Sequence, residues 1–354
     1  MKQYSTVIGM DLGDKLNHFC TLDEAGDVIA QGTVPCTESA LQRFFESQPC
    51  ALVAMETGTH SPWISRLAQS LGHKVLVANA RKLRAIYEDD AKCDEQDAQM
   101  LARIARLDPK LPYPITHRGE TAQADLAVLH SRDIMVQART KLITHVRGSV
   151  KSFGHRLPLC STASFHVKAS SALPEALRSA LEPVLESIAH LTAQIKAYDV
   201  EIESRCKRDY PETELLRSIP GVGPITALGF VLSIEAPERF NRSRNVPAYF
   251  GLTPRRDQSG DTDKQLRITK AGDGFMRRLL VGCAQYILGR YGVDSALRRW
   301  GLKLAERGGK SGKRRAVVAV ARKLAVLLHR LWINGVCYEA FPNGALEDTV
   351  LKEA

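Results

Sequence analysis

Alternation between apolar and polar residues predicts the secondary structure of roughly the first third of the chain. Short apolar runs bounded by turn residues predict strands, whereas apolar residues three and four apart predict helices. Strands are predicted over residues 3–12, 18–22, 28–34, 51–55 and 74–78. Helices are predicted after a capping Thr37, from Ser61–Pro62 and over residues 92–107. This order, βββαβαβα, predicts a mixed sheet covered by helices.

The middle of the chain is predicted to be helical. A long helix is expected over residues 116–153, followed by a loop over 154–174. Apolar residues then recur in alternating steps of four and three, the pattern of a heptad seam. They are Leu177, Leu181, Val184, Ile188, Leu191, Ile195, Tyr198 and Ile202. The seam favours either a helical hairpin within the chain or a coiled-coil contact between subunits, and Pro183 is expected to break or kink it.

Residues 212–234, PETELLRSIPGVGPITALGFVLS, have the pattern of a helix-hairpin-helix motif. Gly221 and Gly223 lie between two segments that are expected to be helical. A glycine turn of this kind can point backbone N–H groups at a DNA phosphate, and a tight turn without a ligand is the equal alternative. A last, basic helix is predicted over residues 314–332 after the loop GGKSGKRR.

These patterns predict an α/β region followed by a mainly helical one. The expected domain limits are 1–155 for the mixed-sheet domain, 156–211 for a helical coiled-coil linker, 212–335 for a C-terminal domain and 336–354 for a tail. A chain of 354 residues is long enough for two or three domains, each with its own core.

Positive charge is concentrated in the second part of the chain. The net charge is +10, but residues 1–150 hold 17 Lys and Arg against 18 Asp and Glu. Residues 212–330 hold 23 against 10. A basic segment is typical of proteins that contact nucleic acids, and the alternative is a generally basic soluble protein.

The cysteines and the apolar segments indicate the cellular compartment of the protein. The eight cysteines are scattered without a CxxC pair, so they are expected to be reduced thiols in a cytoplasmic protein. No signal peptide is recognised. The most apolar late segment, 316–332, is interrupted by Arg322, Lys323, His329 and Arg330, so no membrane span is expected.

Four carboxylates lie where strands end or a helix begins. Asp11 and Glu56 each end a predicted strand, while Asp94 and Asp97 share one face of a predicted helix start. Converging carboxylates repel one another unless cations neutralise them, and hard oxygen ligands select Mg²⁺ or Mn²⁺. Each residue alone is more often structural, as a turn residue or as a helix N-terminal charge. Together they predict a metal site suited to phosphoryl transfer.

A polar, turn-rich segment carries a serine among cations. Ser259 precedes Gly260 in YFGLTPRRDQSG, and a basic helix is expected from near Phe275. A hydroxyl among cations suits attack on a phosphodiester, although a solvated Ser-Gly turn is the more common explanation of this pattern alone. The candidate nucleic-acid-binding residues are Gly221, Gly223, Arg255, Arg256, Lys264, Arg267, Lys270, Arg277, Arg278, Lys313, Arg314 and Arg315.

Several motifs together resemble a known family. VIGMDLG, VAMETGTH and KCDEQDA are similar to the DEDD, RuvC-like domain of insertion-sequence transposases. SIPGVGPITA, YFGLTPRRDQSG and LRITKAGDGFMRRLL are similar to their second domain. The resemblance is to the IS110 family and covers roughly residues 5–335. It implies an RNase H/RuvC-like fold for the first domain.

The resemblance also implies a function. Asp11, Glu56, Asp94 and Asp97 match the family's Mg²⁺-binding quartet, and Ser259 matches its nucleophile. The serine would form a covalent link to a DNA 5′ phosphate, and strands would be exchanged without ATP. The implied partners are donor and target DNA, a noncoding guide RNA and further copies of the chain in a dimer or tetramer. The protein would be nucleoid-associated when bound to DNA.

Two other functions fit part of the sequence. A metal-only nuclease or junction resolvase would use the acidic residues without Ser259. A nucleic-acid-binding protein without catalysis would use the basic domain and need no carboxylates at strand ends. The recombinase accounts for both sets of residues and is the favoured prediction.

Overall fold

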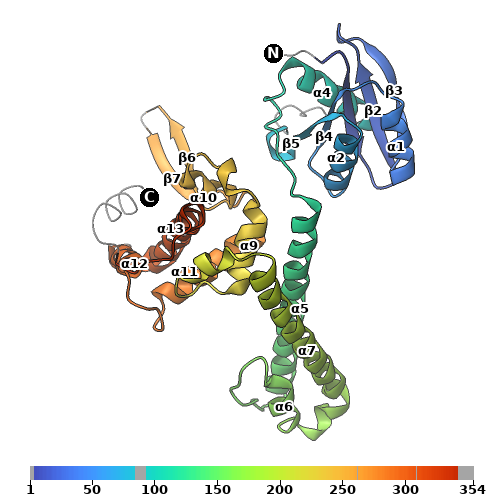
Figure 1. Ribbon diagram of the computed structural model, residues 1–354. Coiled ribbons are helices and arrows are strands. Elements are labelled where there is room, and N and C mark those ends of the chain that lie inside the picture. Colours follow the sequence, from blue (N-terminus) through green and yellow to red (C-terminus); the bar gives the residue numbers. More distant parts are fainter. Residues whose placement is uncertain (1–3, 84–92, 261, 308, 342–354) are drawn as a thin grey trace. The chain divides into compact units, whose positions relative to one another are not determined.

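The computed structural model describes residues 4–83, 93–260, 262–307 and 309–341. Contacts divide the chain into two compact units, Met1–Arg118 and Gly119–Ala354, which we call the sheet unit and the helical unit (Figure 1). The predicted domain limits at 155, 211 and 335 stay predictions. Most of the predicted tail 336–354 lies outside the described residues.

The sheet unit is built on a five-stranded mixed sheet. Its strands are β1 (Val7–Leu12), β2 (Leu16–Leu22), β3 (Val28–Pro35), β4 (Leu52–Glu56) and β5 (Lys74–Ala78). They lie in the order β3-β2-β1-β4-β5, with antiparallel pairing from β1 to β3 and parallel pairing from β1 through β4 to β5. The predicted mixed sheet is therefore confirmed.

Helices cover both faces of the sheet because side chains alternate along each strand. The helices are α1 (Glu38–Glu46), α2 (Ser61–Ser70), α3 (Ala80–Leu83) and α4 (Asp94–Leu107). Ile8 and Met10 of β1 face the core that includes Phe45 of α1. Val7 faces the opposite core, which is closed by α4 residues such as Leu101. Odd-numbered β1 positions therefore face α4.

Two long helices pack together at the start of the helical unit. They are α5 (Glu120–Ser152) and α7 (Arg178–Arg208), separated by α6 (Phe165–Ser170) and the 3-10 turn η1 (Glu175–Leu177). Four seam positions of α7 spaced by seven are buried: Leu181, Ile188, Ile195 and Ile202. Buried Asp125 of α5 joins the pair by bonds to Arg205 and Tyr210. The apolar seam of α7 therefore packs on α5 of the same chain, as expected for the first explanation, a helical hairpin.

Pro183 was predicted to break or kink the helix; the break is wrong, and the kink stays a prediction. Pro183 lies inside α7, near its beginning, and the helix continues to Arg208. A proline removes one N–H, which here would bond the carbonyl of Ser179 one turn earlier. Pro183 is exposed, so water can solvate that carbonyl. The cost is small enough for the packing of α7 on α5 to offset it.

The remaining helices enclose one apolar core around α9. The elements are α8 (Thr213–Arg217), α9 (Pro224–Ile234), η2 (Pro237–Arg239), η3 (Ser243–Asn245), α10 (Val246–Tyr249), β6 (Pro254–Ser259), β7 (Thr262–Ile268), α11 (Gly274–Leu288), α12 (Ala296–Arg307), η4 (Gly309–Ser311) and α13 (Gly312–Asn334). Every residue of α9 from Thr226 to Ile234 is buried. The segment around Gly221 connects α8 to α9, and the helix-hairpin-helix motif predicted there, with its binding of DNA, stays a prediction.

One lysine is buried in this core. Lys323 of α13 is 4% exposed, its Nζ lies 3.8 Å from the centroid of the Trp300 ring, and it has no hydrogen-bond partner among the described residues. Burial lowers the pKa of Lys323 to about 8. Below pH 8 the folded and unfolded chains both carry this proton, so the folded state bears the full cost of the buried charge. Stability should rise as pH rises from about 8 to the ordinary lysine pKa of 10.5.

Lys323→Met should therefore stabilise the helical unit. We expect a gain of about 1–2 kcal/mol at pH 7, because the desolvation cost exceeds the cation–π attraction to Trp300 that is lost. The difference between variant and wild type should disappear towards pH 10.5. Thermal unfolding from pH 7 to 10.5 measures it, with Lys303→Met as control because Lys303 is exposed on α12. A lowered melting temperature would contradict the prediction.

Among the described residues, no helix combines the length and apolar character needed to cross a membrane.

Candidate functional site

The end of β1 places Asp11 beside the first turn of α4. Asp11 has the same parity as Val7 and Gly9, so it lies on the face of the sheet that α4 covers. The side chain is partly exposed because the strand ends at the next residue. The predicted position of Asp11, at a strand end open to solvent, is confirmed.

Gly9 lets α4 approach β1 closely. A Cβ on Gly9 would lie 2.0 Å from the carbonyl oxygen of Ala98 and 2.9 Å from the Cβ of Ala102. Both of these residues are in α4, and both are fully buried. The absence of a side chain at residue 9 therefore sets the distance at which the start of α4 meets the end of β1.

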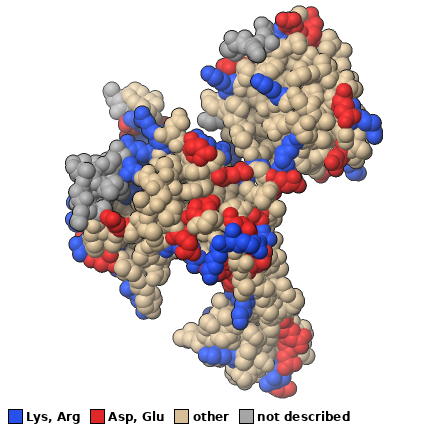
Figure 2. All heavy atoms as spheres, in the orientation of Figure 1, with Lys and Arg blue, Asp and Glu red and all other residues tan. Residues whose placement is uncertain are grey.

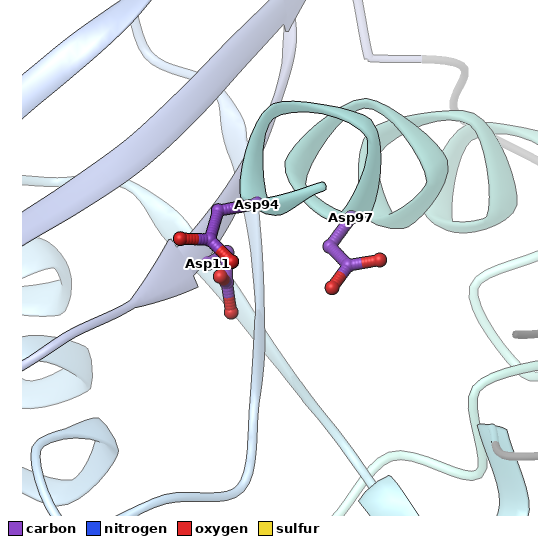
Figure 3. Close-up of side chains that lie close together, drawn as sticks. All are labelled: Asp11, Asp94 and Asp97. Carbon is purple, nitrogen blue, oxygen red and sulfur yellow. The ribbon is translucent and has the colours of Figure 1, made fainter. Parts of the chain in front are cut away.

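Three aspartates meet at this point. Asp94 and Asp97 lie in the first turn of α4, where the helix dipole favours negative charge. Carboxylate oxygens of Asp11, Asp94 and Asp97 all lie within 4.8 Å of one another. Figure 3 shows both α4 side chains leaving the helix on the side where Asp11 lies. We call these three residues the aspartate cluster.

Glu56 lies at the same end of the sheet but outside this cluster. Met55 of β4 pairs with Met10 of β1, so Glu56 follows at the level of Asp11. Glu56 is two residues after Ala54 in β4, so both side chains lie on the same face of the sheet, and Ala54 faces α4. The backbone thus brings Glu56 to the correct face and edge. Its carboxylate is not among the three whose oxygens lie within 4.8 Å.

The aspartate cluster has the chemistry of a divalent-cation site. At 4.8 Å, two ionised carboxylates repel by about 1 to 3 kcal/mol, depending on how far water screens them. A cation bound between them removes this repulsion. The three ligands are all oxygen, which suits Mg²⁺ or Mn²⁺ better than softer metals. Cys93, just before α4, is exposed and is not part of the cluster.

His18 belongs to this site and was missed by the sequence analysis. It pairs with Asp11 across β1 and β2, and its Nε2 lies 3.8 Å from Oδ2 of Asp94. Its Nδ1 is buried without a hydrogen-bond partner among the described residues. At 3.8 Å the imidazole is a neighbour of the Asp94 carboxylate and not its hydrogen-bond partner. The register of the β1–β2 hairpin around the Gly13–Lys15 turn was the signal that could have found it.

Gly9→Ala should displace α4 from β1. The new methyl group would overlap the Ala98 carbonyl, and backbone cannot move aside as a flexible side chain can. We expect a loss of about 2–3 kcal/mol in the stability of the sheet unit. Gly58→Ala is the matched control, since a Cβ there meets nothing within 4 Å. Thermal denaturation checks the pair, and equal melting temperatures for the two variants would show that the close approach is not required.

Ser259 lies at the tip of a β-hairpin. The segment predicted as polar and turn-rich instead forms β6 and β7, which pair antiparallel with Ser259 opposite Thr262. Gly260 has a φ of +52°, which L-residues rarely adopt, and it follows Ser259 in the turn. Ser259 is exposed. The hydroxyl is therefore presented to solvent at the end of a two-stranded arm.

The cations near Ser259 divide between the two faces of the hairpin. Lys264 pairs with Asp257 and shares the face of Ser259, because cross-strand partners point the same way. Arg256 belongs to the opposite face, where its guanidinium makes two hydrogen bonds of 2.7 and 2.6 Å to Asp263. The predicted ring of cations around the serine is thus partly neutralised within the hairpin.

The base of the hairpin is held firmly on the helical core. Cβ atoms on Gly251 and Gly272 would each lie 2.0 Å from a carbonyl oxygen of the other flank, so the two flanks touch through backbone. Arg277 of α11 donates to the carbonyls of Phe250 and Ala271 at 2.9 and 3.4 Å. Asp273 caps α11 by accepting from two backbone N–H groups. A fixed base therefore carries an exposed tip.

The other predicted nucleic-acid-binding residues lie in different settings. Arg255, Arg267 and Lys270 are exposed on or beside the hairpin, where Lys and Arg side chains gather in the space-filling view (Figure 2). Arg278 makes an ion pair with Asp133 of α5.

The last predicted binding residues are the basic residues that follow GGKSG and the two glycines of the turn before α9. The helix predicted from Arg314 begins two residues earlier, at Gly312, so Lys313, Arg314 and Arg315 all lie in the exposed first turn of α13. Gly221 has a φ of +100° and packs on the ring of Tyr286, and Gly223 is exposed at the start of α9.

Comparison with known proteins assigns both halves of the chain to one group. A family model for the transposases of IS116, IS110 and IS902 matches residues 213–301, and a transposase model for the DEDD domain of IS110 elements matches residues 8–154. The chain belongs to the IS110/IS116 family of transposases. The first model spans Ser259 and the second spans all four predicted acidic residues.

Curated relatives are similar in sequence to this transposase over most of its length. The transposase for insertion sequence element IS1328 of Yersinia enterocolitica is 28% identical, over 83% of this chain and 88% of its own. The transposase for IS1111A of Coxiella burnetii is 28% identical, over 92% and 89%. The pilin gene-inverting protein of Moraxella bovis is 26% identical, over 84% of both chains.

Family membership makes DNA the substrate of this transposase, an enzyme of DNA recombination. The aspartate cluster is its candidate metal centre, and the hairpin tip is its candidate nucleophile arm.

Proposed function

We propose that this transposase excises and inserts an insertion sequence through a covalent serine intermediate. The Ser259 Oγ attacks a phosphorus of the DNA backbone, one P–O bond forms to the serine, and the bond to the 3′ oxygen breaks. The serine proton leaves to solvent and the 3′ oxygen gains a proton, so a 5′-phosphoserine and a 3′-hydroxyl result. The reverse attack by a different 3′-hydroxyl rejoins the strands without a nucleotide cofactor.

The observation that carries this proposal is the presentation of Ser259. The hydroxyl of Ser259 is exposed at the tip of a hairpin whose base is held in place. It can therefore approach a phosphate of the DNA backbone, which a buried turn serine could not reach. Lys264 on the same face supplies positive charge for the phosphate. No histidine lies in the hairpin segment, residues 249–272, to act as a base.

The acidic residues are the second part of the proposal. Asp11, Asp94, Asp97 and Glu56 would hold Mg²⁺ or Mn²⁺, which would stabilise charge on the phosphate and on the oxygens that attack and leave. We propose that these residues and Ser259 act on the same DNA linkage.

Two partners complete the proposal. The family resemblance favours a noncoding RNA, made from the element, that selects donor and target DNA by base pairing. It also favours a dimer or tetramer of this chain as the active form. The basic surface of the helical unit, with its excess of Lys and Arg over residues 212–330, can receive these nucleic acids.

An excision and insertion assay tests the function. A plasmid carrying the gene with its natural flanking DNA is incubated with the protein, Mg²⁺ and RNA transcribed from those flanks. Circular element, resealed donor and new insertions are the expected products. Cleaved DNA without a protein–DNA adduct and without joining would instead identify a metal-only nuclease, and binding without cleavage would identify a non-catalytic protein.

A further inference from the structure

A cavity lies where the end of α13 meets the segment that leads into η3. Its volume is about 420 Å³. Its walls include Phe240, Arg242, Ser243, Arg244, Arg330 and Ile333. These residues are separated by up to 93 positions in the sequence, and none belongs to the predicted site or to the hairpin. We call this cavity the arginine pocket.

The described lining of the arginine pocket is rich in arginine. It holds three arginines and no carboxylate. Arg242 and Arg244 are exposed, and Arg330 of α13 is half-buried. Guanidinium groups bind phosphate oxygens through paired N–H donors, so three of them around one space form a site for a phosphate.

The wall that carries Arg242 and Arg244 is held in place from the core. His329, which is fully buried, lies 2.9 Å from the Ser243 Oγ through Nδ1 and 2.9 Å from the Pro237 carbonyl through Nε2. A carbonyl can only accept, so Nε2 carries the proton and Nδ1 accepts from the serine hydroxyl. Ser243 is thereby held between the two arginines, which fixes the position of this part of the wall.

The remaining walls are apolar. Phe240 packs edge-on against Tyr249 and His329, so its ring has a defined orientation. Ile333 is 50% exposed and offers apolar surface at the edge of the pocket. A ligand that fits both kinds of wall has a charged phosphate on one side and a less polar sugar or base on the other.

We propose that the arginine pocket binds one nucleotide of a DNA strand, with its phosphate on Arg242, Arg244 and Arg330 and its sugar on Phe240 and Ile333. A volume of about 420 Å³ lies within the range of small-ligand sites. The pocket is separate from the basic start of α13: seventeen residues from Lys313 to Arg330 at 1.5 Å each place them about 25 Å apart. The proposal rests on DNA as substrate, which the family gives, and not on Ser259 as nucleophile.

Binding of labelled DNA by the full-length protein tests the proposal. Fluorescence anisotropy is measured with a single-stranded DNA of about 20 nucleotides and with RNA of the same sequence, over a range of salt concentrations. The double variant Arg242→Gln/Arg330→Gln should bind the DNA roughly tenfold more weakly at 0.1 M salt, and the slope of log affinity against log salt should fall by about 1. Arg330→Lys should keep part of the affinity, since it keeps the charge but not the paired donors.

Arg156→Gln is the matched control, because Arg156 is an exposed arginine elsewhere in the helical unit. Melting temperatures equal to wild type establish that the variants fold. An unchanged DNA affinity and slope in the double variant would overturn the proposal. So would a loss confined to RNA, or competition by inorganic phosphate that the variants abolish without weakening DNA binding. Failure of the covalent mechanism would not alter this result, because no cleavage is measured.

Discussion

Ser259→Ala is expected to abolish covalent capture of DNA and strand joining. The alanine methyl group cannot form the P–O bond, and removing a nucleophile costs roughly 10³-fold or more in rate. DNA affinity should change less than about twofold, because Ser259 lies at the hairpin tip and the cations of β6 and β7 remain. The measurement is a denaturing gel of protein incubated with labelled donor DNA, which separates covalent adduct from free strands.

The control for this variant is Ser187→Ala. Ser187 is an exposed serine of α7 whose hydroxyl donates to the Pro183 carbonyl, far along the chain from the hairpin. It should give normal adduct and joining. An adduct of normal yield in Ser259→Ala would place the nucleophile on another residue, while continued cleavage without any adduct in the wild type would favour the metal-only nuclease.

Asp11→Asn is expected to remove both metal response and activity. Asp11 supplies the strand-end oxygen of the aspartate cluster, and an amide is a weaker ligand for Mg²⁺ than a carboxylate. In the wild type, Mn²⁺ or Mg²⁺ at 100 times its dissociation constant should stabilise the sheet unit by about 2.7 kcal/mol. This stabilisation should fall by more than half in the variant, and DNA cleavage should fall by roughly 10² or more.

Thermal unfolding with and without metal gives a readout that does not depend on catalysis. Asp27→Asn is the matched control, since Asp27 is an exposed turn acid outside the aspartate cluster. Its metal response should equal that of the wild type. An unaltered metal-induced shift in Asp11→Asn would mean that the cation binds elsewhere, and the aspartate cluster would lose its proposed role.

Local patterns in the sequence predicted the acidic residues of the sheet unit because these residues lie at the ends of strands. Strands in a mixed sheet read as short apolar runs, and the residue that ends each run must meet solvent at the edge of the sheet. Asp11 and Glu56 could be predicted in this way. His18 could not, because its place beside Asp11 depends on the register of a hairpin rather than on any local pattern.

The hairpin was missed for a physical reason. β6 and β7 read PRRDQS and TDKQLRI and are mostly polar, because most of their described side chains are exposed. Their pairing depends on the turn at Gly260 and on the contact of Gly251 with the Gly272 segment. Pro183 does not end the helix for a related reason, since tertiary packing of α7 offset a local cost.

The amino-acid sequence alone determined the sheet, the helical second half, the acidic strand ends and the family, because these depend on local periodicity and on short motifs. Only the tertiary structure decided which carboxylates meet, how Ser259 is presented and that three arginines share a pocket. Arg242 and Arg330 are 88 positions apart, and their approach depends on how η3 packs on α13. Contacts between distant segments follow from the packing of whole elements, which no local pattern records.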